Sequence, residues 1–492
     1  MAEHELKLYS VTQVREIERR AIQSQGLTGH RLMRRAASAV WEELRTTWPD
    51  VQKIGVVCGP GNNGGDGYEV ARLARGARRE VKVWQVGRPP DIGDAAAARA
   101  DWVKGGGAIE TFAAGTSKFD DCEVLVDALF GIGLKRAVEG EALAAIEAMN
   151  AAPAMRLAVD VPSGLDADSG EILGAAVYAH RTVTFIADKQ GFYLGSGPDT
   201  AGDLVLRTLD LPDEVYDAAT AAAELLDRTD LAYWLPPRRA TAHKGDHGHV
   251  LVVGGDHGTL GAALLAAQGA LRAGAGLVSV ATRAEHAAVL AAAQPELMAR
   301  GVEQPRELAP LLERADVIVL GPGLGRSEWG RALFAQLLSA RQSLVVDADG
   351  LNWLAENPSR REDWILTPHP GEAARLLKLD NKAVQSDRFG SVRALQQNFG
   401  GVAVLKGSGT MICGGAGVSL CPYGNPGMAV GGMGDVLAGV IGALLAQGLP
   451  PMDAAQAGVL AHAMAGDSAA EGGERGMIPA DLLAALRKTC NP

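Results

Sequence analysis

The chain has 492 residues, which at ~150 residues per domain allows two or three domains. Its 47% hydrophobic and 21% charged residues exclude wholesale disorder, and 62 glycines beside only 5% aromatic residues favour an α/β architecture over a β-sandwich. The net charge is −11 and no basic stripe stands out, so we expect no nucleic-acid partner.

The cysteines and the N-terminus bear on the cellular compartment. Because the sequence has no CxxC pair, the cysteines predict neither a disulfide framework nor a zinc site; they are Cys58, Cys122, Cys413, Cys421 and Cys490. The opening MAEHELKLYS lacks the apolar stretch of a signal peptide, and no run of ~18 apolar residues is present to cross a bilayer. We therefore expect a cytoplasmic protein without a membrane partner.

The first half of the chain alternates predicted helices with short apolar strands. Ser10 and Gln13 have the spacing of a capping box, and Val14, Ile17 and Ala21 then recur at helical period. A further helix-like segment covers 142–149. Apolar runs that end in Gly- or Asp-bearing loops lie at 54–59, 81–87, 123–131, 157–164 and 182–188. Continuous apolar strands between helices indicate a parallel sheet covered on both faces.

The pattern lapses between about 208 and 246 and then resumes. This stretch is charged, contains proline and lacks a strand signal, so we expect the domain boundary inside it, between domains at 1–222 and 223–492. Apolar runs follow at 249–255, 277–282, 316–323, 343–350, 364–371 and 402–409. The sequence therefore predicts two doubly wound α/β domains in one chain.

A glycine-rich loop, GPGNNGGDG, follows the first of these strands. From Gly59 it matches G-x-G-x-x-G, which alone is a weak dinucleotide pattern and is also met in tight strand-to-helix turns. A Rossmann loop usually keeps small residues where the backbone meets pyrophosphate. Here Asn62, Asn63 and Asp66 crowd the loop, and their oxygens suit a hard cation or a ribose better.

Two aspartates close later strands of the same half. Asp127 ends VLVD, and Asp160 ends LAVD just before Pro162-Ser163-Gly164. The carboxyl ends of parallel strands converge on the ligand crevice of an open sheet, although a single strand-end Asp is often only a helix N-cap. Lys135, in GIGLKR, is the candidate cation for this carboxylate cluster.

Three motifs of this half, GNNGGDG, VDALFGIG and VDVPSGLDADSG, together resemble the NAD(P)H-hydrate epimerase family, over roughly residues 8–210. The resemblance implies a Rossmann-like fold, K⁺ bound by Asn63, Asp127 and Ser163, and Asp160 with Lys135 as the acid/base pair. Residues implied to contact the hydrated dinucleotide are Asn62, Asn63, Gly64, Gly65, Asp66, Gly131, Ile132, Gly133, Leu134, Lys135, Arg136, Ala137 and Asp160.

The chemistry of that family suits these residue types. Hydration of a reduced nicotinamide leaves a hydroxyl at C6, beside the ring nitrogen. Inversion at C6 requires this hydroxyl to leave and return on the other face, or the ring to open and reclose. Either route needs a group that donates and recovers a proton beside a cationic intermediate, and a strand-end carboxylate does both.

A second glycine-rich segment, NPGMAVGGMGD, opens an apolar helix in the second half. Successive backbone amides at Gly431, Gly432 and Gly434 can surround a phosphate at a helix N-terminus. Asp435 follows at the position of a base that takes a proton from an attacking hydroxyl, unless it is only an N-cap. The sequence has no G-x-x-x-x-G-K-[ST] motif, so this is not a P-loop.

The pattern resembles the ribokinase-like superfamily, and its finer motifs resemble the ADP-dependent NAD(P)H-hydrate dehydratase branch over roughly 230–490. These motifs are HKGDHGHVLVVGG, GPGLG, DADGLN, TPHPGE, KGSGT and GGMGD. The resemblance implies Asp435 as catalytic base and Mg²⁺ with the nucleotide. Implied nucleotide contacts are Lys406, Gly407, Ser408, Gly409, Thr410 and Gly434, and implied hydrate contacts are Ala262, Gly325, His369 and Asp435. Without the resemblance, His369 reads as a loop histidine bonded to a backbone carbonyl.

The two halves explain each other, because an epimerase supplies the epimer that a dehydratase accepts. The leading hypothesis is a bifunctional metabolite-repair enzyme that uses K⁺, Mg²⁺ and ADP on small-molecule substrates, as a homo-oligomer. A vitamin or sugar kinase with an accessory domain is the first alternative, and it would release a stable phosphorylated product. A scaffold is the second, because epimerase-like domains also occur in RNA-processing assembly proteins.

Overall fold

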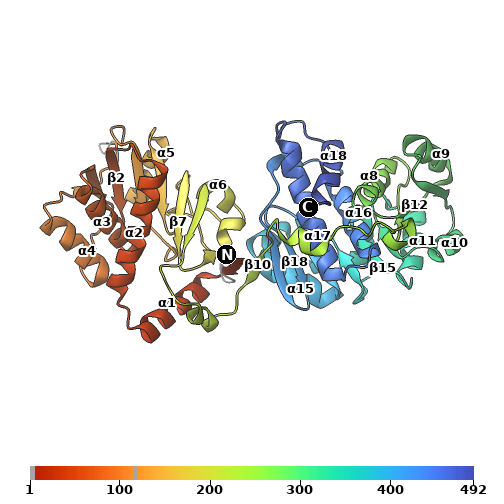
Figure 1. The fold of residues 1–492 in the computed structure, drawn as a ribbon, viewed down its shortest axis with the longest axis horizontal. Helices are drawn as coiled ribbons and strands as arrows, with labels where there is room; N and C mark the ends of the chain where they lie inside the picture. Colours follow the sequence, from red (N-terminus) through yellow and green to blue (C-terminus); the bar gives the residue numbers. More distant parts are fainter. Residues whose placement is uncertain (1–5, 116–118) are drawn as a thin grey trace. The chain divides into compact units, whose positions relative to one another are not determined.

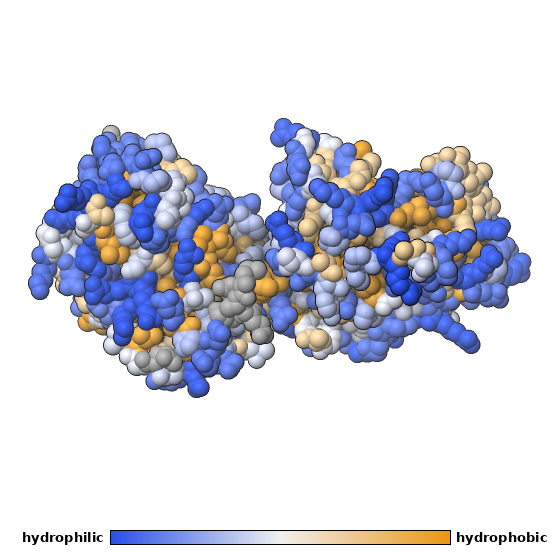
Figure 2. Space-filling model, in the orientation of Figure 1, coloured by the Kyte–Doolittle hydropathy of each residue, from blue (hydrophilic) through white to orange (hydrophobic). Residues whose placement is uncertain are grey.

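The computed structural model describes residues 6–115 and 119–492. Residues 1–5, on which part of the signal-peptide prediction rests, lie outside the described residues. The chain divides into two compact units, Met1–Ala223 and Glu224–Pro492 (Figure 1). None of the helices within the described part is long and apolar enough to cross a membrane. On the face that Figure 2 draws, hydrophilic side chains cover most of each unit.

The N-terminal unit is built on a seven-stranded parallel sheet in the order β4-β3-β2-β5-β6-β7-β9. Separately, β1 pairs in parallel with β8. The strands are β1 (Lys7–Tyr9), β2 (Lys53–Cys58), β3 (Glu80–Gln85), β4 (Glu110–Thr111), β5 (Val124–Ala128), β6 (Met155–Val159), β7 (Arg181–Phe185), β8 (Asp188–Lys189) and β9 (Asp203–Arg207). The helices are α1 (Val11–Gln25), α2 (Gly29–Thr47), α3 (Asn62–Gly76), α4 (Gly93–Lys104), α5 (Gly140–Ala151) and α6 (Gly197–Ala201), with short 3-10 helices at Gln190–Tyr193 and Asp213–Ala218.

Alternate residues of the central strands enter two cores, one on each face of this sheet. Val56 and Val126 pack with α2 and α3 on one face, whereas Val57 and Leu125 pack with α5 on the other. The predicted capping box at Ser10 is confirmed. The Ser10 hydroxyl accepts a hydrogen bond from the Gln13 backbone amide at 3.3 Å, and the Gln13 side-chain oxygen accepts one from the Ser10 backbone amide at 2.8 Å. The strand order turns back between β2 and β5, which is where ligands bind in such sheets.

The C-terminal unit continues the same architecture. Its sheet runs β13-β12-β11-β14-β15-β16-β17 in parallel and ends with the antiparallel pair β18 and β19, beside which β10 pairs in parallel with β19. The strands are β10 (Ala223–Leu225), β11 (His249–Val253), β12 (Leu277–Thr282), β13 (Met298–Gly301), β14 (Val317–Leu320), β15 (Ser343–Val346), β16 (Trp364–Leu366), β17 (Val402–Leu405), β18 (Thr410–Gly414) and β19 (Gly417–Cys421).

The helices of this unit surround its sheet (Figure 1). They are α7 (Asp230–Trp234), α8 (Leu260–Arg272), α9 (Ala284–Ala293), α10 (Ala309–Leu312), α11 (Glu328–Leu337), α12 (Ala348–Glu356), α13 (Pro370–Leu377), α14 (Asn381–Ser386), α15 (Arg388–Phe399), α16 (Met433–Ala446), α17 (Pro451–Ala470) and α18 (Pro479–Thr489), with 3-10 helices at Lys244–His247, Pro305–Leu308 and Pro426–Met428. The apolar helix α16 packs closely on α8, since a Cβ at Gly439 would lie 1.8 Å from the Ala266 carbonyl oxygen. This contact fixes the start of α16, where Asp435 lies.

The two doubly wound domains predicted from the sequence are confirmed, with two differences in detail. The segment 208–246 was expected to lack a strand, but β10 lies within it and pairs through Glu224 and Leu225 with Ser419 and Leu420 of β19. No β-branched residue marks β10, because its conformation is imposed by the neighbouring strand and not by local preference. The antiparallel hairpin of β18 and β19 also departs from a purely parallel sheet.

Candidate active sites

A cleft of about 620 Å³ opens in the N-terminal unit where β2, β5 and β6 end. The predicted site residues that line it are Asn62, Asn63, Asp66, Gly131, Ile132, Gly133, Leu134, Lys135, Arg136 and Asp160. Gly64, Gly65 and Ala137 are not among the described residues of its wall. Gly64 has a structural task instead, because a Cβ there would lie 2.1 Å from the Gly59 carbonyl oxygen. Lys135 is exposed at the mouth of the cleft.

Asp160 follows β6 in the left-handed backbone conformation, with a φ of 65°. This conformation is unfavourable for a residue other than glycine, and such strain is found mainly at functional sites. Its carboxylate Oδ1 accepts a hydrogen bond of 2.7 Å from the Nζ of Lys189. Lys189 is fully buried, and its Nζ also donates to Thr184 Oγ1 at 2.7 Å and to the Phe185 carbonyl at 2.8 Å. The lysine therefore fixes both the charge balance and the orientation of Asp160.

Two further carboxyl groups face the same cleft. Burial and the nearby charge of Asp160 raise the pKa of Asp66 well above its usual value. The same two causes raise the pKa of Glu18, on α1. Asp66 therefore holds a proton under conditions in which an ordinary aspartate is ionised, and it lies beside a carboxylate that is paired with a lysine. Such a pair can give and take a proton within one site.

Asp127 lies beneath the cleft and is bonded to the loop after β6. Its Oδ2 accepts from the Ser163 backbone amide at 2.7 Å, and its Oδ1 accepts from the Ser163 hydroxyl at 2.6 Å. The same hydroxyl lies 3.2 Å from the Phe130 carbonyl oxygen. Burial raises the pKa of Asp127 to about 6. The Nδ2 of Asn63 is also buried, without a hydrogen-bond partner among the described residues.

In the C-terminal unit, Asp435 occupies the first turn of α16, close to Lys406. The N-cap of this helix is Gly432, so the alternative that Asp435 is only an N-cap is wrong. Burial, together with the charge of Asp347, raises the pKa of Asp435 to about 7. A Cβ at Gly434 would lie 3.1 Å from the Lys406 Nζ, which leaves a narrow gap between the helix start and the lysine.

Lys406 pairs with Asp347 at the end of β15. Its Nζ donates to Asp347 Oδ1 at 2.6 Å, and Thr367 donates its hydroxyl to the same oxygen at 2.8 Å. Burial opposes the charge on Lys406, but Asp347 and Glu372 outweigh it and raise the pKa of the lysine. Burial also raises the pKa of Glu372 to about 7. Carboxyl groups therefore outnumber cationic groups around Lys406.

His369 is the N-cap of α13 and lies beside this group. Its Nδ1 accepts from the Gly371 amide at 3.0 Å, and its own backbone amide donates to Glu372 Oε2 at 2.8 Å. The alternative that His369 bonds to a backbone carbonyl is therefore wrong, because its Nδ1 accepts from a backbone amide instead. Burial, together with the positive charge of Lys406, lowers the pKa of His369. The imidazole is thus neutral near pH 7, with its Nδ1 acting as an acceptor.

The remaining predicted hydrate contacts lie where the strand order of this unit turns back, between β11 and β14. Gly325, after β14, has a φ of 73° and donates its amide to Asp349 Oδ2 at 2.9 Å. A Cβ there would lie 2.7 Å from the carboxylate of Asp256, which follows β11. Ala262 lies in the first turn of α8, with its amide 3.2 Å from the Thr259 carbonyl.

The KGSGT loop joins β17 to β18 and rests on a buried arginine. Arg388 donates to the carbonyls of Leu405, Lys406 and Gly409 at 3.3, 3.4 and 3.1 Å. The predicted nucleotide contacts Gly407 and Ser408 are exposed above it. Gly409 and Thr410, also predicted nucleotide contacts, are half-buried.

Several residues that shape the two sites were not among the predicted site residues. Lys189 and Arg388 reach their partners from outside the glycine-rich loops, so only the fold brings them there. Asp347 had a usable signal, because it ends the apolar run SLVVD in the same way as Asp127 and Asp160 end theirs. Glu372 is within TPHPGE and gives no sign in the sequence that it is buried.

Comparisons with known proteins cover the whole chain. The family described as NAD(P)H-hydrate dehydratase matches residues 250–488, and the family described as YjeF-related protein N-terminus matches residues 29–191. The bifunctional NAD(P)H-hydrate repair enzyme of Coxiella burnetii is 47% identical over 99% of both chains. That of Escherichia coli is 45% identical over 97% of this chain and 93% of its own.

Solved structures match the C-terminal part. The ADP/ATP-dependent NAD(P)H-hydrate dehydratase of Bacillus subtilis, co-crystallised with ATP and Mg²⁺, is 28% identical with a TM-score of 0.50, over 55% of this chain and 98% of its own. A ribokinase-like superfamily protein of Enterococcus faecalis is 28% identical with a TM-score of 0.52, over 56% and 97%. The match over nearly the full length of the curated relatives shows that this chain belongs to the family of bifunctional NAD(P)H-hydrate repair enzymes.

Proposed function

We propose that this chain repairs hydrated NADH and NADPH in two steps. The N-terminal unit interconverts the R and S forms at C6, and the C-terminal unit dehydrates the S form at the expense of ADP, giving AMP and phosphate. The observation that carries the proposal is an aspartate beside a buried lysine at the carboxyl ends of the strands in each unit. The family of the relatives supports the pairing of the two activities.

In the epimerase unit, Asp66 and Asp160 divide the proton transfers. Asp66 keeps its proton because its pKa is raised, so it donates that proton to the departing C6 hydroxyl as the ring nitrogen lone pair forms the C6–N double bond. The carboxylate of Asp160 stabilises the cationic ring and accepts a proton from the water that adds to the other face. Lys189 is a positioning residue that holds this carboxylate. Lys135 lies exposed and stays a second candidate for the acid.

Potassium fits the oxygen-rich pocket under this cleft. The Asp127 carboxylate, the Ser163 hydroxyl and the Phe130 carbonyl meet there, and among the described residues no cationic side chain pairs with this carboxylate. The Oδ1 of Asn63 faces the neighbouring loop, because a Cβ at Gly131 would lie 3.4 Å from it. Asn63, Asp127 and Ser163 would hold the ion. It would supply positive charge beneath the loops that carry Gly131 and Asp160, close to the phosphates of the substrate.

In the dehydratase unit, Asp435 acts as the base. With its pKa near 7, the carboxylate is present at neutral pH and is basic enough to take the proton of the C6 hydroxyl. The hydroxyl oxygen then attacks the β-phosphorus of ADP, and AMP departs. The ring nitrogen lone pair expels inorganic phosphate from C6, and loss of a proton from C5 restores the dihydronicotinamide double bond. Positioning and charge neutralisation supply most of the rate in such transfers.

The nucleotide is expected over the KGSGT loop and the start of α16. Lys406 offers an ammonium group, and Gly434 brings the start of α16 close beside it. The residues described in this pocket form no group of three ligand-type side chains that would hold a metal by themselves. Mg²⁺ would therefore enter with the co-substrate, bound by the phosphates of the nucleotide, which is how this ion is commonly bound.

The proposal is tested by incubating the purified chain with a mixture of both hydrate epimers, ADP, Mg²⁺ and K⁺. Complete recovery of dihydronicotinamide absorbance, faster than spontaneous epimerisation, with one inorganic phosphate released per molecule, is expected. Recovery that stalls at one epimer would contradict the epimerase assignment alone. A stable phosphorylated product in place of inorganic phosphate would support the kinase alternative.

A further inference from the structure

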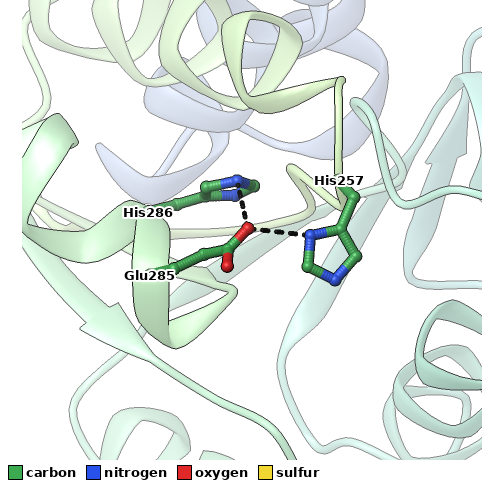
Figure 3. Close-up of side chains that lie close together, drawn as sticks. All are labelled: His257, Glu285 and His286. Carbon is green, nitrogen blue, oxygen red and sulfur yellow. Dashed lines mark hydrogen bonds and ion pairs between the residues drawn. The ribbon is translucent and has the colours of Figure 1, made fainter.

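Three side chains of metal-ligand type meet at the edge of the C-terminal unit. His257 comes from the loop after β11, and Glu285 and His286 come from the first turn of α9. Their ligand atoms all lie within 4.8 Å of one another. Glu285 Oε1 lies 2.9 Å from the Nδ1 of His257 and 3.3 Å from the Nε2 of His286. Figure 3 shows both imidazoles against this one carboxylate.

The hydrogen bonding of His286 prepares its Nε2 as a ligand. Its other ring nitrogen, Nδ1, lies 3.0 Å from the carbonyl oxygen of Gly255, which accepts only. Nδ1 therefore carries the proton, and the lone pair of Nε2 points at the cluster. A backbone carbonyl that fixes the tautomer in this way is a common feature of histidines that bind metals. The His286 ring is mostly buried, with 14% of its side chain exposed, so its orientation is held.

The charge around the cluster favours a cation. Arg283, two positions before Glu285, is bound by two carboxylates, Asp256 at 2.8 Å and Glu303 at 2.8 Å. Its guanidinium also lies 4.6 Å from the centre of the Trp329 ring. Because Asp256 and Glu303 offset Arg283, this arginine does not supply a free positive charge to Glu285. A metal ion bound to the two imidazoles would place positive charge beside Glu285.

We propose that His257, Glu285 and His286 bind a divalent transition-metal ion such as Zn²⁺. Two donor atoms on a tetrahedral zinc at ~2.0–2.2 Å lie about 3.3–3.6 Å apart. The two separations from Glu285 Oε1, 2.9 and 3.3 Å, therefore need to open by only a few tenths of an ångström. Two imidazoles and one carboxylate leave the fourth position to water. Imidazole ligands favour zinc, copper or nickel and disfavour magnesium, which prefers oxygen. The ion would join the loop after β11 to α9.

A second cluster of the same kind in the N-terminal unit lacks this charge balance. His30, Glu69 and Asp101 also lie close together. However, Glu69 Oε2 already pairs with Arg72 at 2.7 Å and lies 3.8 Å from Arg34. Two guanidinium groups beside the only buried carboxylate oppose a bound cation. Closeness of ligand-type side chains is therefore not enough for a metal site, and the surrounding charge distinguishes the His257 cluster from the His30 cluster.

The test is titration of the tag-free full chain with Zn²⁺ by calorimetry, in a buffer with excess Mg²⁺. One equivalent is expected to bind per chain. Glu285→Gln and His286→Ala are expected to weaken this binding by about 100-fold or more, since even changes in the second ligand shell cost 10–100-fold. Titration with Co²⁺ is expected to give the visible bands of a tetrahedral ion in the original chain, and these bands are expected to be lost in both variants.

A matched control is His243→Ala. His243 is an exposed histidine of the same unit whose Nδ1 lies 3.6 Å from one carboxylate, that of Asp246, and it belongs to no three-residue cluster among the described residues. This variant is expected to bind Zn²⁺ as the original chain does. The proposal is overturned if Glu285→Gln and His286→Ala also bind Zn²⁺ unchanged, or if His243→Ala weakens binding as much as they do. Because Glu285→Gln is isosteric and exposed, misfolding would not account for its effect.

Discussion

Both units place a lysine beside an aspartate, but the lysine holds a different aspartate in each. In the N-terminal unit, Lys189 binds Asp160, the proposed catalytic carboxylate, at 2.7 Å. In the C-terminal unit, Lys406 binds Asp347 at 2.6 Å, and Asp435 is left among carboxylates with a pKa raised to about 7. The same residue types thus make a charge-balanced, fixed carboxylate in one unit and a stronger base in the other.

The largest expected effect comes from removing each aspartate in turn. Asp435→Asn should lower dehydration of the S epimer by about 10²–10⁴-fold and leave epimerisation intact, because a general base contributes about that much. Asp160→Asn should do the reverse. Each activity is measured separately, with the S epimer and ADP for dehydration and with the R epimer alone for epimerisation. Circular dichroism provides the control for folding.

Independence of the two sites is what this pair of variants measures. If either single change removed both activities from a folded protein, the units would share a catalytic step, and the comparison between them would fail. Equal partial losses of both activities in either variant would also indicate that the units share a catalytic step.

The lysines should differ in the kind of defect that they produce. Lys189→Met leaves the Asp160 carboxylate, 14% exposed in the wall of the cleft, without its cationic partner. This should lower the free energy of unfolding, by at most about 3–5 kcal/mol, and abolish epimerisation. Lys406→Met leaves Asp347 with the Thr367 hydroxyl, and it should raise the KM for ADP more than it lowers folding stability. Denaturant unfolding and steady-state kinetics measure the two effects.

The control for these variants is the activity of the other unit. Dehydration in Lys189→Met and epimerisation in Lys406→Met should remain at the level of the original chain. A Lys189→Met protein that epimerises normally would rule out the positioning role assigned to this lysine.

Most of the fold was predictable because its signals are local. Apolar runs marked the central strands of both sheets, and the spacing of Ser10 and Gln13 marked a helix start. β10 was not predictable, because three residues, Ala-Glu-Leu, become a strand only through pairing with β19. The glycine-rich loops and strand-end aspartates indicated where the sites lie, since parallel strands all end at one edge.

The electrostatic arrangement inside the sites was not predictable in the same way. Asp160 and Lys189 are 29 positions apart in sequence, and Asp347 and Lys406 are 59 apart. Which lysine reaches which carboxylate depends on the packing of side chains across neighbouring strands. The raised pKa values of Asp66 and Asp435 depend on burial, which a motif does not report.

The two activities should respond to pH in opposite directions. Asp435 must lose its proton to act, so dehydration should rise with pH up to an apparent pKa near 7, with about a tenfold loss for each pH unit below it. Asp66 must keep its proton, so epimerisation should fall as pH rises past the raised pKa of this group. The pH dependence of kcat/KM, measured with the S epimer for dehydration and the R epimer for epimerisation, tests both expectations. Two profiles with the same direction would contradict the assignment of base and acid.

The smallest expected effect is that of potassium on stability. An ion held by Asn63, Asp127 and Ser163 stabilises only the folded state, and at about ten times its Kd it contributes about 1.4 kcal/mol. For the unfolding of a unit of the size of Met1–Ala223 that corresponds to a rise in Tm of about 3–5 °C. Thermal unfolding in KCl is compared with unfolding in choline chloride at equal ionic strength. Because the Asp127 carboxylate supplies the only full charge among the three ligands, Asp127→Asn should remove the difference between the salts, and a difference that survives this change would place the potassium effect elsewhere.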